Sequence, residues 1–213
     1  MDQKQKLLGY YNYTVILTYI GMLTGFIGII YAFENNSFGA VICLMIAGLC
    51  DMFDGTIAST RERTEQEKCF GIQIDSFSDL ICFGALPAII VYSQSKHNQV
   101  VLMICSLYLL CALIRLAYFN VDEQERQQSS DTSREIYYGM PVTLSALFLP
   151  IVHGAVCLFS WRPAIVPTAA LLTMAILFLL PFPLRKPKLI GKICVVLCGI
   201  LEVGFVLFAC DGV

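Results

Sequence analysis

The sequence predicts an all-α polytopic membrane protein with about seven transmembrane helices, in a range of six to eight. Hydrophobic residues make up 57% of its 213 residues and the mean hydropathy is +0.72, whereas charged residues make up only 14%. A soluble domain carries about 25% charged residues, so this composition indicates a chain embedded in membrane lipid. The formal net charge of −2 gives no sign of a nucleic-acid partner, and we expect none.

Apolar segments that are long enough to cross a bilayer recur along the chain. A spanning helix needs roughly 20 mostly apolar residues. Seven segments meet this requirement: 13–33, 38–57, 71–94, 98–120, 139–159, 163–182 and 189–210. We find no internal repeat and no soluble second domain, so we expect a single integral membrane domain over residues 1–213.

The N-terminal segment 1–12 is polar and precedes a long apolar run. Because no convincing small-residue cleavage site follows that run, we expect a first membrane helix rather than a removed signal peptide. We place segment 1–12 in the cytoplasm, where residues 2–12 could form an interfacial helix.

The distribution of Lys and Arg predicts the orientation of the chain. With the N-terminus inside, ten basic residues fall in inside segments and two in outside loops. The inside residues are Lys4, Lys6, Arg61, Arg63, Lys68, Arg126, Arg134, Arg185, Lys186 and Lys188, and the outside residues are Lys96 and Arg162. Loops rich in Lys and Arg stay on the cytoplasmic side. We therefore expect a multi-pass protein of the cell membrane with a cytoplasmic N-terminus.

Four carboxylates mark the stretch between the second and third predicted spans. With small residues they form two stripes: Asp51, Asp54 and Ala58, and Gly71, Asp75 and Asp79. Each stripe lies on one face of a helix, and both lie at the cytoplasmic ends of their spans. If the stripes face each other, the four carboxylates converge and repel one another unless a cation fills the site. Oxygen ligands at this density suit a hard divalent ion, Mg²⁺ or Mn²⁺.

Other interpretations of these residues stay open. The aspartates could cap or solvate helix ends at the interface, although an ionised Asp at membrane depth usually has a function. They could also belong to a proton or cation pathway, which needs carboxylates spread across the bilayer depth, whereas these crowd at one face. Gly55 and Gly71 would let a ligand approach closely, or small residues such as Gly55 and Ala58 could serve close helix packing.

The acidic pattern resembles the signature of a known enzyme family. Asp51-x2-Asp54-Gly55-x2-Ala58, followed by Gly71-x3-Asp75-x3-Asp79, is similar to the motif of the CDP-alcohol phosphatidyltransferases. The resemblance implies the fold of that family and a single integral membrane catalytic domain. It also implies the family's reaction, in which a phosphatidyl group moves from CDP-diacylglycerol to an alcohol and CMP is released.

The chain departs from the family pattern in two places. The family has an Arg directly after the Ala, where this chain has Ser59, with Arg61 and Arg63 nearby. The connection from Ala58 to Gly71 is also about three residues longer than the usual pattern. The sequence therefore leaves open which basic residue, if any, meets the nucleotide phosphates.

Three further segments resemble bacterial and archaeal phosphatidylserine synthases. The run 75–88 is similar to their DSxxDxxxFGxxPA motif. Residues 114–120 are similar to their RLARFN segment, with Tyr118 in place of the second Arg, and residues 138–142 are similar to their GLP segment. This resemblance implies L-serine as the acceptor and phosphatidylserine as the product. The alternatives are the same chemistry with glycerol phosphate, inositol phosphate or choline, or, from a different class, a cation transporter.

The resemblance also implies roles for individual residues. Asp51, Asp54 and Asp75 would bind two divalent ions, Mg²⁺ or Mn²⁺. Asp79 would bind metal and also act as the general base. The cytidine pocket would be lined by Gly55, Ala58, Ser59 and Gly71. Arg115, supported by Asn120, is our candidate for holding the carboxylate of serine, although Arg115 could instead be a snorkelling charge at the interface. Family members are commonly homodimers, so we expect a homodimer in the membrane.

Overall fold

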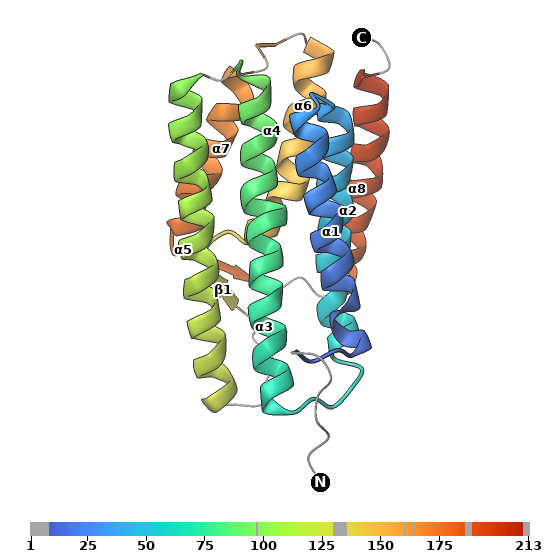
Figure 1. The fold of residues 1–213 in the computed structure, drawn as a ribbon, viewed down its shortest axis with the longest axis vertical. Helices are drawn as coiled ribbons and strands as arrows, with labels where there is room; N and C mark the ends of the chain where they lie inside the picture. Colours follow the sequence, from blue (N-terminus) through green and yellow to red (C-terminus); the bar gives the residue numbers. More distant parts are fainter. Residues whose placement is uncertain are drawn as a thin grey trace.

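Helical passes run side by side along the long axis of the molecule, as Figure 1 shows. The computed structural model describes residues 9–96, 98–129, 136–159, 161–162, 164–185 and 189–210. Within these residues there are seven passes: α1 (Ile16–Phe33, after the 3₁₀ turn η1, Tyr13–Val15), α2 (Ser37–Ala58), α3 (Glu65–Asp79) continued by η2 (Leu80–Ala85) and α4 (Leu86–Gln94), α5 (Gln99–Ser129), α6 (Ser145–Phe159, after η3, Val142–Leu144), α7 (Ile165–Leu179) and α8 (Leu189–Cys210).

The helices confirm the predicted fold class. Five helices of the described residues are long and apolar enough to cross a membrane, and two shorter apolar helices, Ile165–Leu179 and Cys194–Ala209, accompany them. The protein is therefore a multi-pass membrane protein, and its described residues are helical apart from connections and two short strands. Of the segment that could form an interfacial helix, residues 1–8 lie outside the described residues, and 9–12 are not helical.

Three predicted helix boundaries were wrong. The third pass begins at Glu65 rather than 71, because Thr64 and Glu67 form a capping box, with bonds of 2.9 and 3.2 Å between each backbone N–H and the other side chain. Helix α5 runs on to Ser129, beyond the predicted end at 120. The fifth predicted span starts at 139, but Gly139 adopts a φ of +79°, so the helical turns begin only at Val142.

A π-helical turn, η2, separates α3 from α4. Pro87 has no N–H to donate to the carbonyl group of Phe83. That carbonyl oxygen instead accepts hydrogen bonds from the hydroxyl groups of Tyr108 at 2.7 Å and Ser145 at 3.4 Å. The turn therefore joins the third pass to α5 and α6, directly after Asp79.

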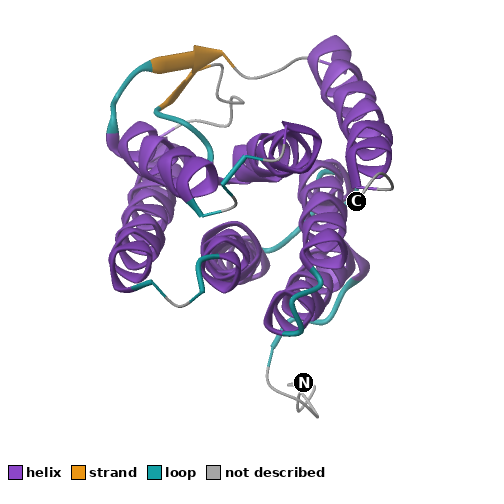
Figure 2. Cartoon of the chain, turned by 90° about the horizontal axis from the view of Figure 1, so that it is seen from above, coloured by secondary structure: helices purple, strands orange, loops and turns teal. Residues whose placement is uncertain are grey.

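Two strands, β1 (Ile136–Tyr138) and β2 (Pro183–Arg185), were not predicted. They pair antiparallel, with Tyr137 opposite Leu184. Seen end-on in Figure 2, the strands lie at one side of the helical bundle. They join the α5–α6 connection to the α7–α8 connection.

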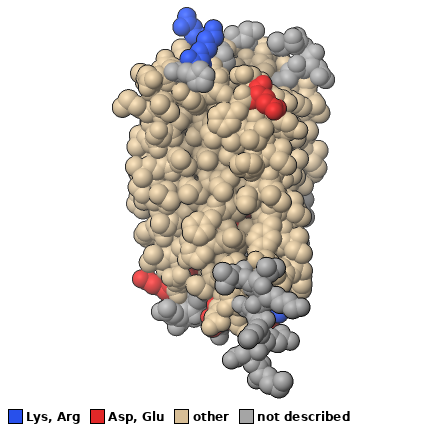
Figure 3. All heavy atoms as spheres, in the orientation of Figure 1, with Lys and Arg blue, Asp and Glu red and all other residues tan. Residues whose placement is uncertain are grey.

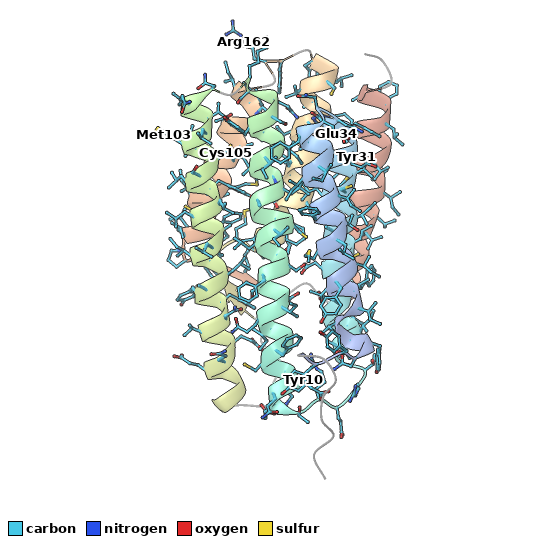
Figure 4. The ribbon with its side chains drawn as sticks, in the orientation of Figure 1. Tyr10, Tyr31, Glu34, Met103, Cys105 and Arg162 are labelled. Carbon is cyan, nitrogen blue, oxygen red and sulfur yellow. The ribbon has the colours of Figure 1, made fainter. Side chains whose placement is uncertain are left out.

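The outer surface of the bundle is apolar. Met103 is 73% exposed and points away from the bundle in Figure 4, whereas Cys105 is buried. On the face that Figure 3 shows, the described Lys, Arg, Asp and Glu side chains lie toward the two ends of the molecule. This distribution fits a bilayer around the middle of the bundle.

Candidate active site

The carboxylates of the two predicted stripes lie together between α2 and α3. One carboxylate oxygen from each of Asp51, Asp54 and Asp75 lies within 4.8 Å of the other two. The fourth aspartate, Asp79, is the most buried, and its carboxyl group is in hydrogen-bonding contact with that of Asp51. Asp54 and Asp75 make the same kind of contact across the two helices.

Helix α1 holds one side of this site. The hydroxyl group of Thr18 donates to Asp54 at 3.3 Å, and the backbone carbonyl of Thr18 accepts from Ser78 at 3.4 Å. These bonds require α1 to lie close to both helices. Gly21 permits this, because a Cβ atom there would lie 3.2 Å from the Cβ of Cys50.

The donor set of the acidic cluster suits a hard cation. Carboxylates in direct contact are stable only with a proton or a cation between them. The group of Asp51, Asp54 and Asp75 offers oxygen atoms alone, and Asp79 adjoins it, which is the coordination that Mg²⁺ and Mn²⁺ favour. The cluster could therefore hold a metal ion.

A cavity of about 680 Å³ opens beside the acidic cluster. Its polar residues are Asp51, Asp75, Asp79, Arg115 and Thr143. Most of the remaining wall is apolar and comes from α2, α5, η3, α6 and α8, with residues such as Leu49, Phe119, Leu147 and Val203. The site thus combines a charged region with a large apolar space.

Three of the residues expected at the cytidine pocket lie at the C-terminal end of α2, and Gly71 lies within α3. The two glycines among the four differ in their surroundings. A Cβ atom on Gly55 would meet nothing within 4 Å, so close helix packing does not explain the glycine there. A Cβ on Gly71 would lie 3.2 Å from Nη1 of Arg63. Ala58 is half-buried, and Ser59 donates its hydroxyl to the carbonyl oxygen of Thr56 at 2.7 Å.

Arg115 lies inside the protein rather than at an exposed interface. Only 8% of the residue is exposed, and the guanidinium group donates to the carbonyl oxygens of Met140 at 3.3 Å and Gly139 at 3.4 Å. Its position on the cavity wall does not fit a snorkelling charge. Asn120 is held separately, by a 2.8 Å bond from the hydroxyl of Ser76.

Sequence reasoning did not single out Thr143, and it did not distinguish Arg63 from Arg61. Thr143 lines the cavity, but its sequence context is an ordinary apolar helix start, which carries no signal. Arg63 was one of two basic residues near the motif, and only the fold distinguishes it from Arg61. The positive φ of Gly139, which allows the turn before Thr143, is a second feature that residue types alone do not specify.

Comparison with known proteins gives one family and several relatives. The sequence model of the family described as CDP-alcohol phosphatidyltransferase matches residues 11–201. The chain is 35% identical over 112 residues to the CDP-diacylglycerol–serine O-phosphatidyltransferase of Saccharomyces cerevisiae, which covers 51% of this chain and 40% of the yeast protein. It is 30% identical over 122 residues to the archaetidylserine synthase of Methanothermobacter thermautotrophicus, covering 57% of this chain and 52% of that protein.

A third relative is matched over more of its length. The chain is 26% identical over 155 residues to the CDP-diacylglycerol–serine O-phosphatidyltransferase of Bacillus subtilis, which covers 71% of this chain and 78% of the relative. The matches to the yeast and archaeal relatives span about half of their length or less.

Proposed function

This chain belongs to the CDP-alcohol phosphatidyltransferase family, and we propose that it transfers the phosphatidyl group of CDP-diacylglycerol to the hydroxyl group of L-serine, giving phosphatidylserine and CMP. The observation that carries the proposal is the convergence of Asp51, Asp54, Asp75 and Asp79 beside a large, mainly apolar cavity. The choice of serine is supported by the names of the yeast and Bacillus relatives. We take residues 1–213 as one catalytic domain.

The cavity suits a lipid whose head carries phosphates. Its apolar walls from α2, α6 and α8 can take up the glycerol and acyl portion, and its acidic region can meet the diphosphate through cations. The open space at Gly55 leaves room for the nucleotide beside the carboxylates. We assign the cytidine pocket to Gly55, Ala58, Ser59 and Gly71.

The residues that would hold metal are the aspartates of the cluster, with Asp51, Asp54 and Asp75 as ligands and Asp79 adjoining. Two divalent ions, Mg²⁺ or Mn²⁺, would neutralise charge on the transferring and leaving phosphates. Thr18 keeps Asp54 oriented toward the cluster through its 3.3 Å bond.

Asp79 is our candidate for the general base. The serine hydroxyl oxygen attacks the phosphorus atom of the phosphatidyl group, its proton passes to a carboxylate oxygen of Asp79, and the bond from that phosphorus to CMP breaks. Asp79 is the most buried of the four aspartates and lines the cavity, so an acceptor in the cavity can reach it. Its burial also limits the access of competing water.

Arg115 and Thr143 line the same cavity as Asp79 and are our candidates for binding the acceptor. The positive charge of Arg115 would attract the carboxylate of serine. The hydroxyl group of Thr143 can donate to that carboxylate or accept from the ammonium group. Asn120, fixed by Ser76 next to Asp75, supports this side of the site.

We place the site on the cytoplasmic side of the cell membrane. Arg61, Arg63 and Lys68 lie in or beside the α2–α3 connection, at one end of the bundle (Figure 1), and this connection joins the two helices that carry the aspartates. In Figure 4, Tyr10 lies at this end and Arg162 at the opposite one. A cytoplasmic site would let serine and CMP exchange with water while the acyl chains stay in lipid. A homodimer in the membrane is part of the proposal.

The test is CMP release by the purified protein in detergent, with CDP-diacylglycerol and Mn²⁺. L-serine, glycerol 3-phosphate, inositol phosphate and choline are added in separate reactions, with Asp79→Asn and the distant control Glu34→Gln alongside. We expect release with serine alone, retained by Glu34→Gln and lost in Asp79→Asn. Release with another acceptor would refute serine but keep the chemistry. If folded protein released no CMP with any acceptor, the enzyme proposal would be abandoned for cation transport.

A further inference from the structure

The connection between α2 and α3 is braced against the N-terminal segment. The hydroxyl groups of Tyr13 and Thr60 lie 3.0 Å apart, and Tyr10 donates to Gln66 at 2.8 Å. Asn12 donates to Glu67 at 3.3 Å. These bonds fix the position of the connection relative to the acidic cluster, so the side chains it carries have defined places.

The two arginines of this connection differ in their partners. Nη2 of Arg61 lies 3.5 Å from Oε1 of Glu67, and its side chain is 43% exposed. Arg63 is half-buried, and among the described residues its guanidinium group makes neither an ion pair nor a hydrogen bond. A guanidinium group offers five N–H donors. Within the described part of the chain, the donors of Arg63 therefore have no protein acceptor.

The guanidinium group of Arg63 lies over Gly71, on the same helix stripe as the catalytic carboxylates. Its Nη1 is 3.2 Å from the place that a Cβ of Gly71 would occupy. Gly71 precedes Asp75 by about one helical turn, and Asp79 follows after another. The cation therefore lies at the level of Gly71, about one helical turn before Asp75, and no ion pair joins it to an aspartate among the described residues.

We propose that Arg63 binds the diphosphate of the CDP-linked substrate. The inference rests on the proposed function, because it assigns a contact in that same site. A diphosphate carries oxygen atoms that a planar guanidinium group can bind in pairs, and its other oxygens can face the acidic cluster through cations. Gly71 has no side chain to block this approach.

The proposal accounts for both departures from the family motif. Ser59 stands where the family has an Arg, and its hydroxyl group caps its own helix through Thr56. The longer connection to Gly71 carries Arg63 across to α3 instead. The charge therefore reaches the site from the connection rather than from the end of α2.

The experiment measures CDP binding to the purified protein in detergent with Mn²⁺, by calorimetry. We compare wild type, Arg63→Gln, Arg63→Met, Arg63→Lys and the matched control Arg61→Gln. We expect both neutral variants at position 63 to weaken CDP binding by about tenfold to a hundredfold, which is the effect of losing a charged hydrogen bond. The affinity of Arg63→Lys for CDP should lie between those of the neutral variants and wild type, because lysine keeps the charge but lacks the planar guanidinium group. The affinity of Arg61→Gln for CDP should stay within about twofold of wild type.

The outcomes separate this inference from the proposed function. If wild type binds CDP and releases CMP, but the neutral Arg63 variants bind CDP as wild type does, the assignment of Arg63 is wrong and the proposed function stands. An equal loss of CDP affinity in Arg61→Gln would also overturn the assignment, because the effect would then come from the overall positive charge of the connection and not from Arg63. If wild type neither binds CDP nor releases CMP, the proposed function itself fails. Folding of each variant is judged by size-exclusion chromatography. Two neutral variants are used so that CDP binding can still be measured in one if the other misfolds.

Discussion

The hydroxyl group of Tyr108 donates a 2.7 Å hydrogen bond to the backbone carbonyl of Phe83, at the π-helical turn that follows Asp79. Pro87 leaves this carbonyl without its helical donor. We expect Tyr108→Phe to lower the free energy of unfolding by about 1–2 kcal/mol, because a fully buried acceptor loses its shorter bond. Thermal unfolding in detergent measures this. Tyr118→Phe, at a site that is 59% exposed, should change little; equal effects would contradict the role of the bond.

Asp79→Asn should reduce CMP release by about a hundredfold to ten-thousandfold, because the amide cannot accept the proton of the acceptor hydroxyl. The measurement is the turnover number at saturating CDP-diacylglycerol and serine. Binding of CDP should persist, since most of the cluster remains. Turnover within tenfold of wild type would show that another group acts as the base.

Removal of divalent ions should abolish CMP release, and Mn²⁺ or Mg²⁺ should restore it. A cation at the acidic cluster also stabilises the folded protein, by about 2.7 kcal/mol at a concentration one hundred times its Kd. We therefore expect Mn²⁺ to raise the Tm of wild type and of Glu34→Gln, and to raise that of Asp54→Asn less. An equal rise in all three proteins would place the stabilising ion elsewhere.

Thr143→Val should raise the KM for serine by about twofold to tenfold, the effect of one lost neutral hydrogen bond. The KM for CDP-diacylglycerol should stay unchanged, because we assign Thr143 to the acceptor. Initial rates at varied serine and at varied lipid separate the two values. The control is Thr173→Val, whose hydroxyl group donates to its own helix at the carbonyl of Ala169.

Gly55→Ala should affect substrate binding, whereas Gly28→Ala should affect stability. A Cβ on Gly55 meets only open space, so we expect the protein to fold normally and its KM for CDP-diacylglycerol to rise as the nucleotide site fills. A Cβ on Gly28 would lie 2.8 Å from the Cβ of Cys43, so that variant should lower the Tm. If Gly55→Ala unfolded at a lower temperature with unchanged kinetics, the glycine would serve packing.

The helical fold and the acidic cluster were predictable because both depend on patterns that are local in the sequence. Apolar runs of spanning length identify the passes, and the spacing of Asp51, Asp54, Asp75 and Asp79 places them on two helix faces. The capping box at Thr64 and Glu67 was also present in the sequence, yet its effect on the start of α3 was missed because the span was predicted from the apolar residues that begin at 71.

The remaining features depend on contacts between distant segments. Arg115 was expected to meet a substrate, but the carbonyl groups that it binds, on Gly139 and Met140, are visible only in the fold. The difference between Arg61 and Arg63 likewise arises from Glu67 and Gly71, which the longer connection brings to them. No local pattern encodes the pairing of β1 with β2.

The pairing of β1 with β2 has a consequence for the order in which the protein is assembled. The two strands flank α6 and α7, so β1 has no partner until both of these helices have been synthesised and inserted. The turn that Arg115 holds follows β1 directly, and the N–H of Gly139 bonds the carbonyl of Phe182 just before β2. We therefore expect the wall of the cavity to form late in biogenesis, so that a nascent chain exposes its acidic helices before it can enclose a lipid.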